Sequence, residues 1–436
     1  MKKLIVIITF VFASCIGLYA EDVIQIRPAN IKAGLTDDDE ICLEVRMVNE
    51  SFSVANLQFD LLLPEGVAYS YYAEGEAIPS TKKGKNYIYD FDVQDNVLAS
   101  GYTRFLFVPK NELRPIENSD EVLLYLYITT SSTLKDGVYP ILIDNIELDK
   151  TVTVSIKDIG MTASYLTVGN YSLETATNVD LSGMTGYIPS FVVEQLNTDI
   201  ASNTNLRSLN LSGTTFANLG AELSVPNNDN LLWYTSDKAS LNRTFKGEQW
   251  NTVCLPFTLQ TSYLKASTVV KEMADYDGEA TITLGDVTTM ETGKPYLIYS
   301  STDGQLIKDV TISNPVSVSN EPSTTSSNSL TMRGTYQEAT VKSDGGYTRY
   351  GFTNGKFVML GTGAATVPPF RAYLEYLGKS STRSINIAGD GTTGINSTIS
   401  DDESNGPLYD LRGVMMNEGQ QNKGIFVRNG KKQILK

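Results

Sequence analysis

The chain has 436 residues, 41% hydrophobic and 19% charged, so it can build globular cores, and its length predicts roughly two to four domains. Its formal charge of −15 disfavours binding to the phosphate backbone of nucleic acids. It contains no histidine, which excludes Ser-His-Asp and Cys-His catalysis and every histidine-ligated metal site. Carboxylate-only chemistry, such as glycoside hydrolysis, remains open.

Residues 1–20 predict a secretory signal peptide. Two lysines precede an apolar run that reaches Leu18, and Ala20 stands before Glu21. A positive start, a short apolar core and a small residue at the cut are typical of exported proteins. We therefore expect cleavage between Ala20 and Glu21 and a product that is secreted or attached to the cell surface. Lipoprotein processing at Cys15 is the alternative, and no later segment is long and apolar enough to predict a membrane span.

Residues 21–168 predict a β-sandwich. Apolar and polar residues alternate at 23–27, 41–47 and 57–61, and this alternation places one face of each strand on a core. About nine short strands separated by Gly, Asp and Ser turns are expected. The segment holds 24 acidic and 12 basic residues. We interpret this acidity chiefly as a source of solubility outside the cell.

The strand and turn at 57–67, LQFDLLLPEGV, and the later DGVYP at 136–140 resemble the cohesin-like domains of secreted Bacteroidetes proteins. This resemblance covers residues 21–168. It implies a jelly-roll β-sandwich, related in fold to carbohydrate-binding modules, that binds a protein partner, which in the family is a dockerin. The resemblance assigns no binding residue to a position of this chain.

Two local features of this segment suggest ligand sites. The acidic run at 37–40 offers the oxygen ligands that calcium uses, although a solvated turn is the preferred interpretation. Tyr69, Tyr71 and Tyr72 are candidates for a flat platform on which sugar rings stack. The alternative is that Tyr69 and Tyr71 share one face of a sheet and simply pack against it.

Residues 169–245 contain a pattern typical of leucine-rich repeats. NLRSLNLSG at 205–213 matches the strand-forming core of such a repeat, VDLSG at 179–183 matches its end, and LLWY at 231–234 is a candidate third rung. A helix is expected at 192–201. Because each rung buries its leucines only against its neighbours, three rungs are about the minimum for a stable solenoid. The alternative is a chance match within an ordinary β-domain.

Residues 246–386 predict a second β-domain. The order WNTVCLPF, GKPYLIY, RGTY and PPFRAYLEY resembles a β-module of Bacteroidetes surface proteins that also carry leucine-rich repeats. The resemblance implies no catalytic activity. Trp250 and Cys254 are interpreted as core residues of an apolar strand, and 275–279 as a tight turn. Cys42 and Cys254 are expected to be buried free thiols.

The C-terminal part is predicted to be a linker at 387–407 followed by a tail at 408–436. The linker is rich in Gly, Thr, Ser and Asp. In the tail, YDLRG and KGIFVRNGKK predict two or three short strands. They resemble the C-terminal sorting tails of the type IX secretion route, in a form shorter than the full sorting domain. The alternative is a β-hairpin that seals the preceding domain.

The pattern as a whole favours a non-catalytic binding or adhesion protein that engages a protein partner, or secondly a polysaccharide. No catalytic, metal or cofactor site is predicted from these motifs. A carbohydrate-active enzyme with two carboxylates is the competing hypothesis, because acidic residues are abundant. A third hypothesis is a structural subunit of a surface appendage that accepts a donated strand.

Overall fold

The computed structural model is a mainly β protein, which confirms the predicted fold class. It divides into two compact units, Met1–Ala388 and Gly389–Lys436, which are described separately. The structure describes residues 22–39, 41–49, 54–70, 81–83, 91–109, 120–150, 156–158, 161–215, 223–361, 363–388, 408–409, 415–416, 424–428 and 431–435. The domain boundaries proposed from the sequence within the first unit remain predictions.

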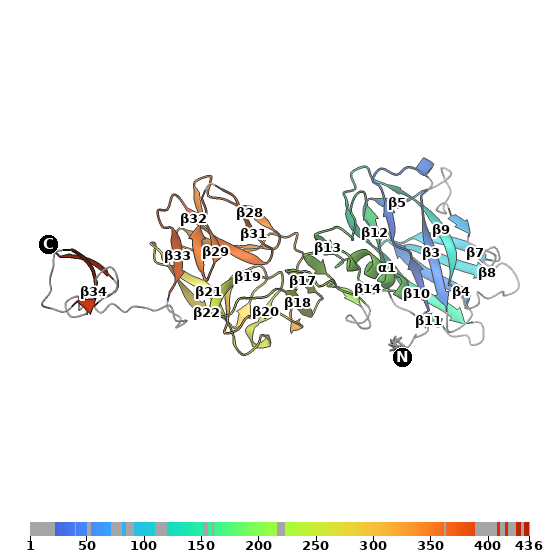
Figure 1. Ribbon diagram of the computed structural model, residues 1–436. Coiled ribbons are helices and arrows are strands. Elements are labelled where there is room, and N and C mark those ends of the chain that lie inside the picture. Colours follow the sequence, from blue (N-terminus) through green and yellow to red (C-terminus); the bar gives the residue numbers. More distant parts are fainter. Residues whose placement is uncertain are drawn as a thin grey trace, which may run out of the picture. The chain divides into compact units, whose positions relative to one another are not determined.

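The first unit begins with two sheets (Figure 1). One sheet has the order β1 (Asp22–Ile26), β3 (Cys42–Asn49), β9 (Asp120–Thr130) and β5 (Val67–Tyr69), with β6 (Thr81–Lys83) on β9. The other has the order β16 (Thr214–Thr215), β14 (Gly186–Tyr187), β12 (Thr162–Val168), β10 (Gly137–Lys150), β4 (Val54–Leu62), β8 (Thr103–Pro109) and β7 (Phe91–Val97), with β11 (Ile156–Asp158) on β10 and β2 (Ala29–Ile31) on β12.

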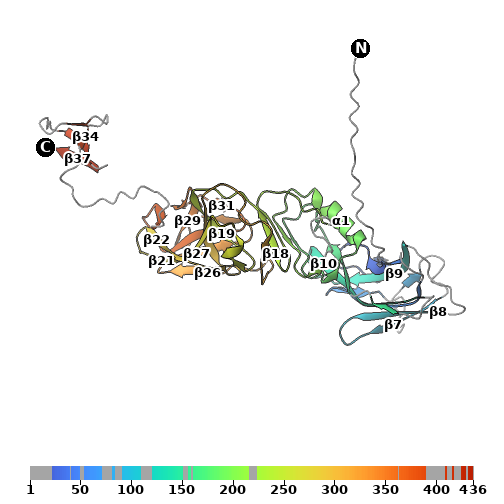
Figure 2. The same ribbon diagram turned by 90° about the horizontal axis from the view of Figure 1, so that it is seen from below.

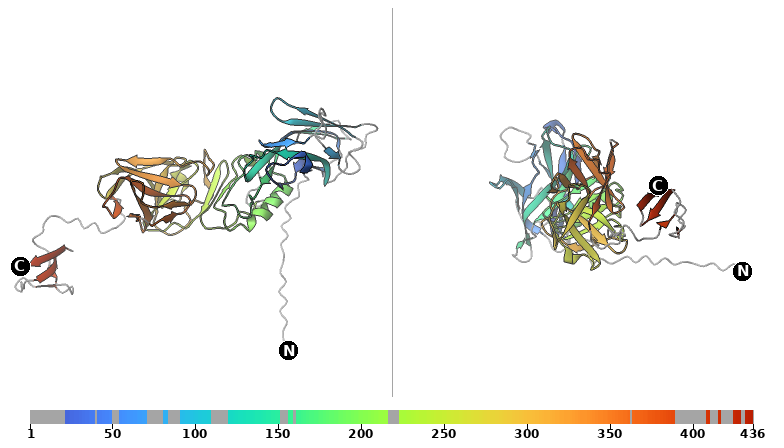
Figure 3. Two further views of the ribbon diagram at one scale, coloured as in Figure 1. Left: turned by 90° about the horizontal axis from the view of Figure 1, so that it is seen from above. Right: turned by 90° about the vertical axis from the view of Figure 1, so that its left-hand side faces the viewer.

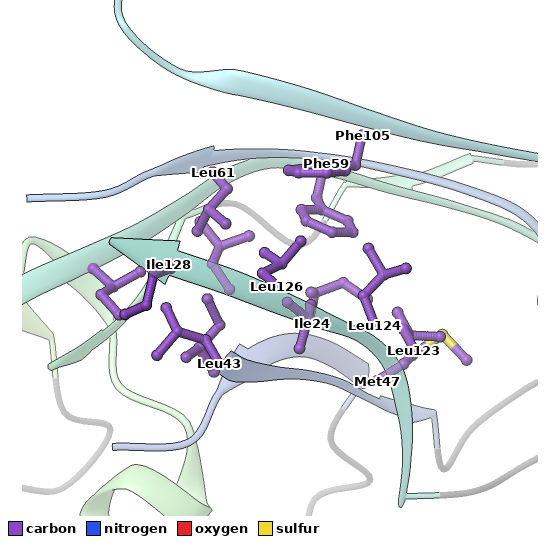
Figure 4. Packing of buried hydrophobic residues seen from close by; sticks show 14 of the residues in the cluster. Ile24, Leu43, Met47, Phe59, Leu61, Phe105, Leu123, Leu124, Leu126 and Ile128 are labelled. Atoms are coloured by element: carbon purple, nitrogen blue, oxygen red, sulfur yellow. The ribbon is translucent and has the colours of Figure 1, made fainter. Parts of the chain in front are cut away.

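The predicted alternation builds the core between these sheets. Phe59 of β4 stacks on Phe105 of β8, with ring centroids 5.2 Å apart. In β9 the pairing with β3 shifts by one residue, so Leu123 and Leu124 are both buried although they are adjacent in the sequence (Figure 4). A β-bulge of this kind interrupts strict alternation, and simple period-two counting does not anticipate it.

Strand β12 contributes to two cores at once. All seven of its residues are buried. Leu166 and Val168 pack into the core between the two sheets, whereas Ala163 and Tyr165 pack into a second core with helix α1 (Ser190–Ala201). Figure 2 shows α1 beside β10, the neighbour of β12. A strand covered on both faces needs no polar alternation, which explains the sequence TASYLTV.

The segment after β12 forms short parallel strands in register. They are β13 (Asn178–Asp180), β15 (Ser208–Asn210) and β17 (Leu231–Tyr234). The repeated turns after β13 and β15 make the same bonds, since Ser182 donates to Asp180 and Ser212 donates to Asn210 through both backbone and hydroxyl groups. These strands lie at the three positions expected for leucine-rich rungs, and assignment to that repeat class remains a prediction.

Gly213 is required at the second of these turns. Its φ is +88°, and a Cβ there would lie 2.8 Å from the carbonyl oxygen of Ser182. Any larger residue would strain the backbone and push the two turns apart.

Strand β17 joins this segment to the second β-domain. Leu231 belongs to the core around α1, whereas Leu232 and Tyr234 belong to the next core. On its other edge β17 pairs with β18 (Lys238–Asn242), which pairs with β25 (Val310–Thr311). The middle segment is therefore closed at both ends by strands that it shares with neighbouring cores.

The strands of the second β-domain lie close together (Figure 3, yellow to orange). Its main sheet has the order β19 (Gln249–Cys254), β24 (Pro295–Ser300), β21 (Thr268–Tyr276), β22 (Thr281–Asp286), β33 (Ser384–Ile387), β30 (Lys356–Met359), β29 (Tyr347–Thr353), β32 (Arg371–Leu377), β27 (Leu330–Thr335) and β26 (Thr324–Ser327). Two small pairs are β20 (Leu259–Gln260) with β23 (Thr289–Met290), and β28 (Ala339–Val341) with β31 (Ala365–Val367).

The second unit is a small antiparallel sheet. Its described strands are β34 (Leu408–Tyr409), β35 (Met415–Met416), β36 (Gly424–Arg428) and β37 (Lys431–Leu435), in the order β35-β34-β36-β37. The two or three short strands expected here are thus four. The sorting-tail interpretation remains a prediction.

Cys42 and Cys254 are not joined by a disulfide, as expected. Cys254 is fully buried, and burial raises the pKa of its thiol. Cys42 is only partly buried, so the expectation of two buried thiols was wrong for this residue. The reason is its position at the start of β3, next to the exposed Ile41.

Removing side-chain volume from one face of β12 should destabilise the core on that face directly and the core on the other face through the shared strand. We expect Leu166→Ala to lower the free energy of unfolding by about 2–5 kcal/mol, because Leu166 is fully buried. The exposed Leu377 is the matched control, and Leu377→Ala should change stability by less than about 0.5 kcal/mol. Hydrogen exchange should rise in β15 as well as in β4. Faster exchange in β4 alone would contradict the shared-strand model.

Candidate functional site

Of the site residues proposed from the sequence, only Tyr69 lies among the residues that the structure describes. Tyr69 is half-buried, and its ring meets Phe105 edge-on with centroids 6.2 Å apart. This contact agrees with the packing alternative for Tyr69. Tyr71 and Tyr72 lie outside the described residues, as do Ala20 and Glu21 at the expected cleavage site. The sugar platform and the cleavage site are therefore untested.

The two acidic runs form hydrogen-bonded turns. The short helix η1 (Asp37–Asp39) places Asp39 against Lys32 and Thr36, and these bonds lower the pKa of Asp39 to about 2. In the other run, Asp277 accepts three backbone N–H bonds, from Glu279, Ala280 and Thr281. Within the described part of the chain, no three acidic or cysteine side chains gather as a metal site.

A polar cleft opens where β2 and β12 face α1, and we call it the β12–α1 cleft. Its volume is about 290 Å³. The lining residues come from β2, β12, α1 and the turn between β12 and β13: Pro28, Ala29, Asn30, Tyr165, Thr167, Tyr171, Ser172, Leu173, Glu174, Gln195 and Asp199.

The carboxylate of Asp199 is held in place by two neutral donors. The Tyr165 hydroxyl donates to Oδ2 at 2.9 Å, and Gln195 Nε2 donates to Oδ1 at 2.7 Å. Gln195 and Asp199 are four residues apart on α1, so they lie on the same face of the helix. Burial and the nearby Asp199 charge raise the pKa of Tyr165, which keeps its phenol protonated as a donor.

The remaining walls of the cleft are also fixed by hydrogen bonds. Asn30 Nδ2 donates to Thr167 Oγ1 at 2.9 Å, which ties β2 to β12. The Tyr171 hydroxyl donates to the carbonyl oxygen of Asn178 at 3.0 Å. Positions fixed in this way need little rearrangement when a ligand binds.

The charged groups that line this cleft are all acidic. Asp199 and Glu174 are its carboxylates, and no lysine or arginine is among the lining residues. Carboxylates and amide oxygens accept hydrogen bonds from ammonium, guanidinium and hydroxyl donors. The arrangement therefore suits a cationic or strongly donating group on the ligand.

Sequence reasoning missed this cleft because its walls are far apart in the chain. Pairing of β2 with β12 and packing of α1 on β12 bring positions 28–30, 165–174 and 195–199 together. One signal was present. The helix expected at 192–201 carries Gln195 and Asp199 one turn apart, next to its apolar face.

About a third of the chain is similar to solved structures of cohesin modules. The seventh ScaB type I cohesin of Pseudobacteroides cellulosolvens is 18% identical, covering 34% of this chain and 92% of its own, with a TM-score of 0.26. A non-cellulosomal cohesin of Archaeoglobus fulgidus is 14% identical, and the match covers 35% of this chain and 93% of the cohesin, with a TM-score of 0.26. The third ScaB cohesin of R. flavefaciens was solved in complex with a group 1 dockerin and is 18% identical. The match covers 35% of this chain and 99% of the cohesin, with a TM-score of 0.26.

No family model and no curated protein sequence matches the chain. No helix among the described residues has the length and apolar character needed to cross a membrane.

Alkaline pH should lower the free energy of unfolding through ionisation of Tyr171, which lines the β12–α1 cleft. Burial, and secondly the Asp180 charge, raise the pKa of Tyr171 to about 12, against about 10 in an unfolded chain. The folded state thus favours the protonated phenol, and this contribution is complete below pH 10 and is lost as the pH rises towards 12. We expect a loss of about 2–3 kcal/mol.

Chemical denaturation of the wild type and of Tyr171→Phe between pH 9 and 12 measures this contribution. Phenylalanine cannot ionise, so the variant should lose less stability over that interval. The exposed Tyr263 provides the control, and Tyr263→Phe should follow the wild type. Parallel curves for Tyr171→Phe and the wild type would contradict the assignment.

Proposed function

We propose that this chain is a non-catalytic binding protein that takes a basic side chain of a protein partner into the β12–α1 cleft. The observation that carries the proposal is the acidic lining, in which Asp199 is already oriented by Tyr165 and Gln195. An oriented carboxylate forms short, charge-assisted hydrogen bonds with lysine or arginine. Such a bond is stronger than one between neutral groups.

The acidic composition of the preceding domain is compatible with a basic partner. Residues 21–168 contain twice as many acidic as basic residues, 24 against 12. A surface of one sign attracts a partner of the opposite sign and speeds the encounter. The attraction should therefore weaken as salt is added.

A polysaccharide is the second candidate ligand, and one observation makes it less favoured. Sugar rings bind well on exposed aromatic faces. Tyr165, one of the two tyrosines that line the cleft, is only 2% exposed. Tyr171 is half-buried and its hydroxyl is already engaged by Asn178.

The enzyme alternative draws on the same two carboxylates, Asp199 and Glu174. Glycoside hydrolysis by two carboxyl groups needs one of them to carry and donate a proton. Both oxygens of Asp199 accept hydrogen bonds, from Tyr165 and Gln195. We therefore assign Asp199 the role of a binding group rather than a general acid.

We also infer that the protein acts outside the cell. The support is the leader-like sequence at 1–20 with the small residue Ala20 at its end. The acidic composition is compatible with solubility there. Export would be shown by recovery of a chain that begins at Glu21 from the medium or the cell surface.

Short peptides test the cleft directly. Calorimetry with the full chain would compare a Gly-rich pentapeptide whose central residue is arginine, lysine or citrulline, which is neutral. We expect the arginine and lysine peptides to bind more tightly than the citrulline peptide. Asp199→Asn should weaken their binding about 10-fold or more, the range expected for a hydrogen bond to a charged group.

The matched control is Glu194→Gln, which changes an exposed acid on the same helix outside the cleft. It should leave the affinities unchanged. Equal binding of the citrulline peptide, or no effect of Asp199→Asn, would exclude this role for the cleft. Saturable binding of an oligosaccharide instead would favour the glycan alternative, and its hydrolysis would favour the enzyme.

A further inference from the structure

A second cavity lies in the second β-domain, separate from the β12–α1 cleft. Its volume is about 280 Å³. Its wall is mainly apolar and comes from β29, β30, β31 and β32 with the turn before β32, including Phe352, Val358, Leu360, Val367 and Pro368. The one charged residue that lines it is Arg371, the first residue of β32.

The guanidinium of Arg371 has no acidic partner among the described residues. Its backbone pairs with Thr335, and its Nε atom is buried without a hydrogen-bond partner in the described part of the chain. Arg371 belongs to the PPFR sequence at 368–371, a motif noted in the sequence but without a role in the cleft. The motif thus places a cation on the wall of an apolar cavity.

A second arginine lies behind this wall. Arg243 is only 5% exposed, and its Nη1 donates to the carbonyl oxygen of Thr252 at 2.8 Å. Thr252 itself lines the cavity. The guanidinium also lies over the Phe245 ring, 4.3 Å from its centroid, and its Nε has no partner among the described residues.

Arg243 is buried and Arg371 is partly buried, and their like charges oppose each other. Burial lowers the pKa of Arg243 and of Arg371, and the charge of Arg371 lowers that of Arg243 further. Arginine nevertheless stays protonated in proteins. A buried and a partly buried positive charge without a counter-charge among the described residues are destabilising.

Two other arginines of the same sheet are paired with a buried acid. Glu375 of β32 accepts from Arg333 Nε at 2.8 Å and from Arg349 Nε at 2.9 Å. Glu375 is only 5% exposed and lies four residues after Arg371 on one strand. No such acid is provided for Arg371 and Arg243 within the described residues.

The turn that presents Arg371 has a strained backbone. Phe370 has φ of +58°, an unfavourable value for a bulky residue. Its carbonyl oxygen faces Arg243 Nη1 at 3.5 Å and accepts from the backbone N–H of Cys254 at 3.3 Å. Strain of this kind concentrates at ligand sites, where the surrounding structure holds it.

We propose that this cavity binds an organic carboxylate, whose charged group pairs with Arg371 and whose apolar body fills the space between β30 and β31. The anion would supply the counter-charge that no described residue provides here. A planar guanidinium matches a carboxylate with two parallel hydrogen bonds. The apolar wall favours a ligand with a hydrocarbon part over a fully hydrated inorganic anion.

Calorimetry with the full chain tests this with simple probes: 3-phenylpropionate, its neutral amide, sulfate and phosphate. We expect saturable binding of 3-phenylpropionate and at least about 10-fold weaker binding of the amide. Sulfate and phosphate should bind more weakly than the organic acid. Arg371→Gln should weaken 3-phenylpropionate binding about 10- to 100-fold, and Arg371→Lys should retain part of it.

Two controls separate ligand binding from a structural role. Arg383→Gln changes an exposed arginine outside the cavity and should leave binding unchanged. Without ligand, Arg371→Gln should have an equal or higher melting temperature than the wild type, because an unpaired, partly buried charge is removed. Asp199→Asn should not affect this site, which keeps the result distinct from that of the β12–α1 cleft.

The proposal is overturned if 3-phenylpropionate does not bind saturably, or if Arg371→Gln binds it as the wild type does. Equal affinity for the amide would exclude recognition of the charge. Equal affinity for sulfate would exclude recognition of the apolar body. A lower melting temperature of Arg371→Gln together with unchanged binding would show that Arg371 has only a structural role.

Discussion

The burial of β12 on both faces is the constraint on which the rest of the first unit depends. Leu166 and Val168 complete the core between the two sheets, while Ala163 and Tyr165 form part of the core under α1. A sheet face that would otherwise meet water is thereby covered by the following segment. Burial of apolar area drives this arrangement, because it is the largest favourable term in folding.

The same principle repeats along the chain. β17 places Leu231 in one core and Leu232 in the next, so the short parallel strands are closed at both ends. Stacked short strands cannot bury their apolar residues alone and need such covers. The β12–α1 cleft lies at one of these shared strands, where polar residues can line a hollow between two cores without disrupting either of them.

The arginines of the second β-domain differ in whether an acidic residue lies beside them. Glu375 of β32 pairs with Arg333 of β27 and Arg349 of β29, whereas Arg371, on the same strand as Glu375, has no described acid beside it. Neutralised buried charges add little net stability. A partly buried charge without an acidic partner among the described residues is better explained by a ligand than by folding, and the strained turn at Phe370 supports that view.

Local pattern alone determined much of this protein: the alternating strands of the sandwich, the helix near 192–201, the strand sites at 179, 208 and 231, and the turn at Asp277. These features depend on neighbours within a few residues, so sequence period and turn chemistry predict them. Only the tertiary structure decided that β12 serves two cores, that Asp199 meets Tyr165, and that Arg243 lies near Arg371. The residues of these two pairs lie 34 and 128 positions apart in the sequence, and no local pattern encodes which distant surfaces will bury each other.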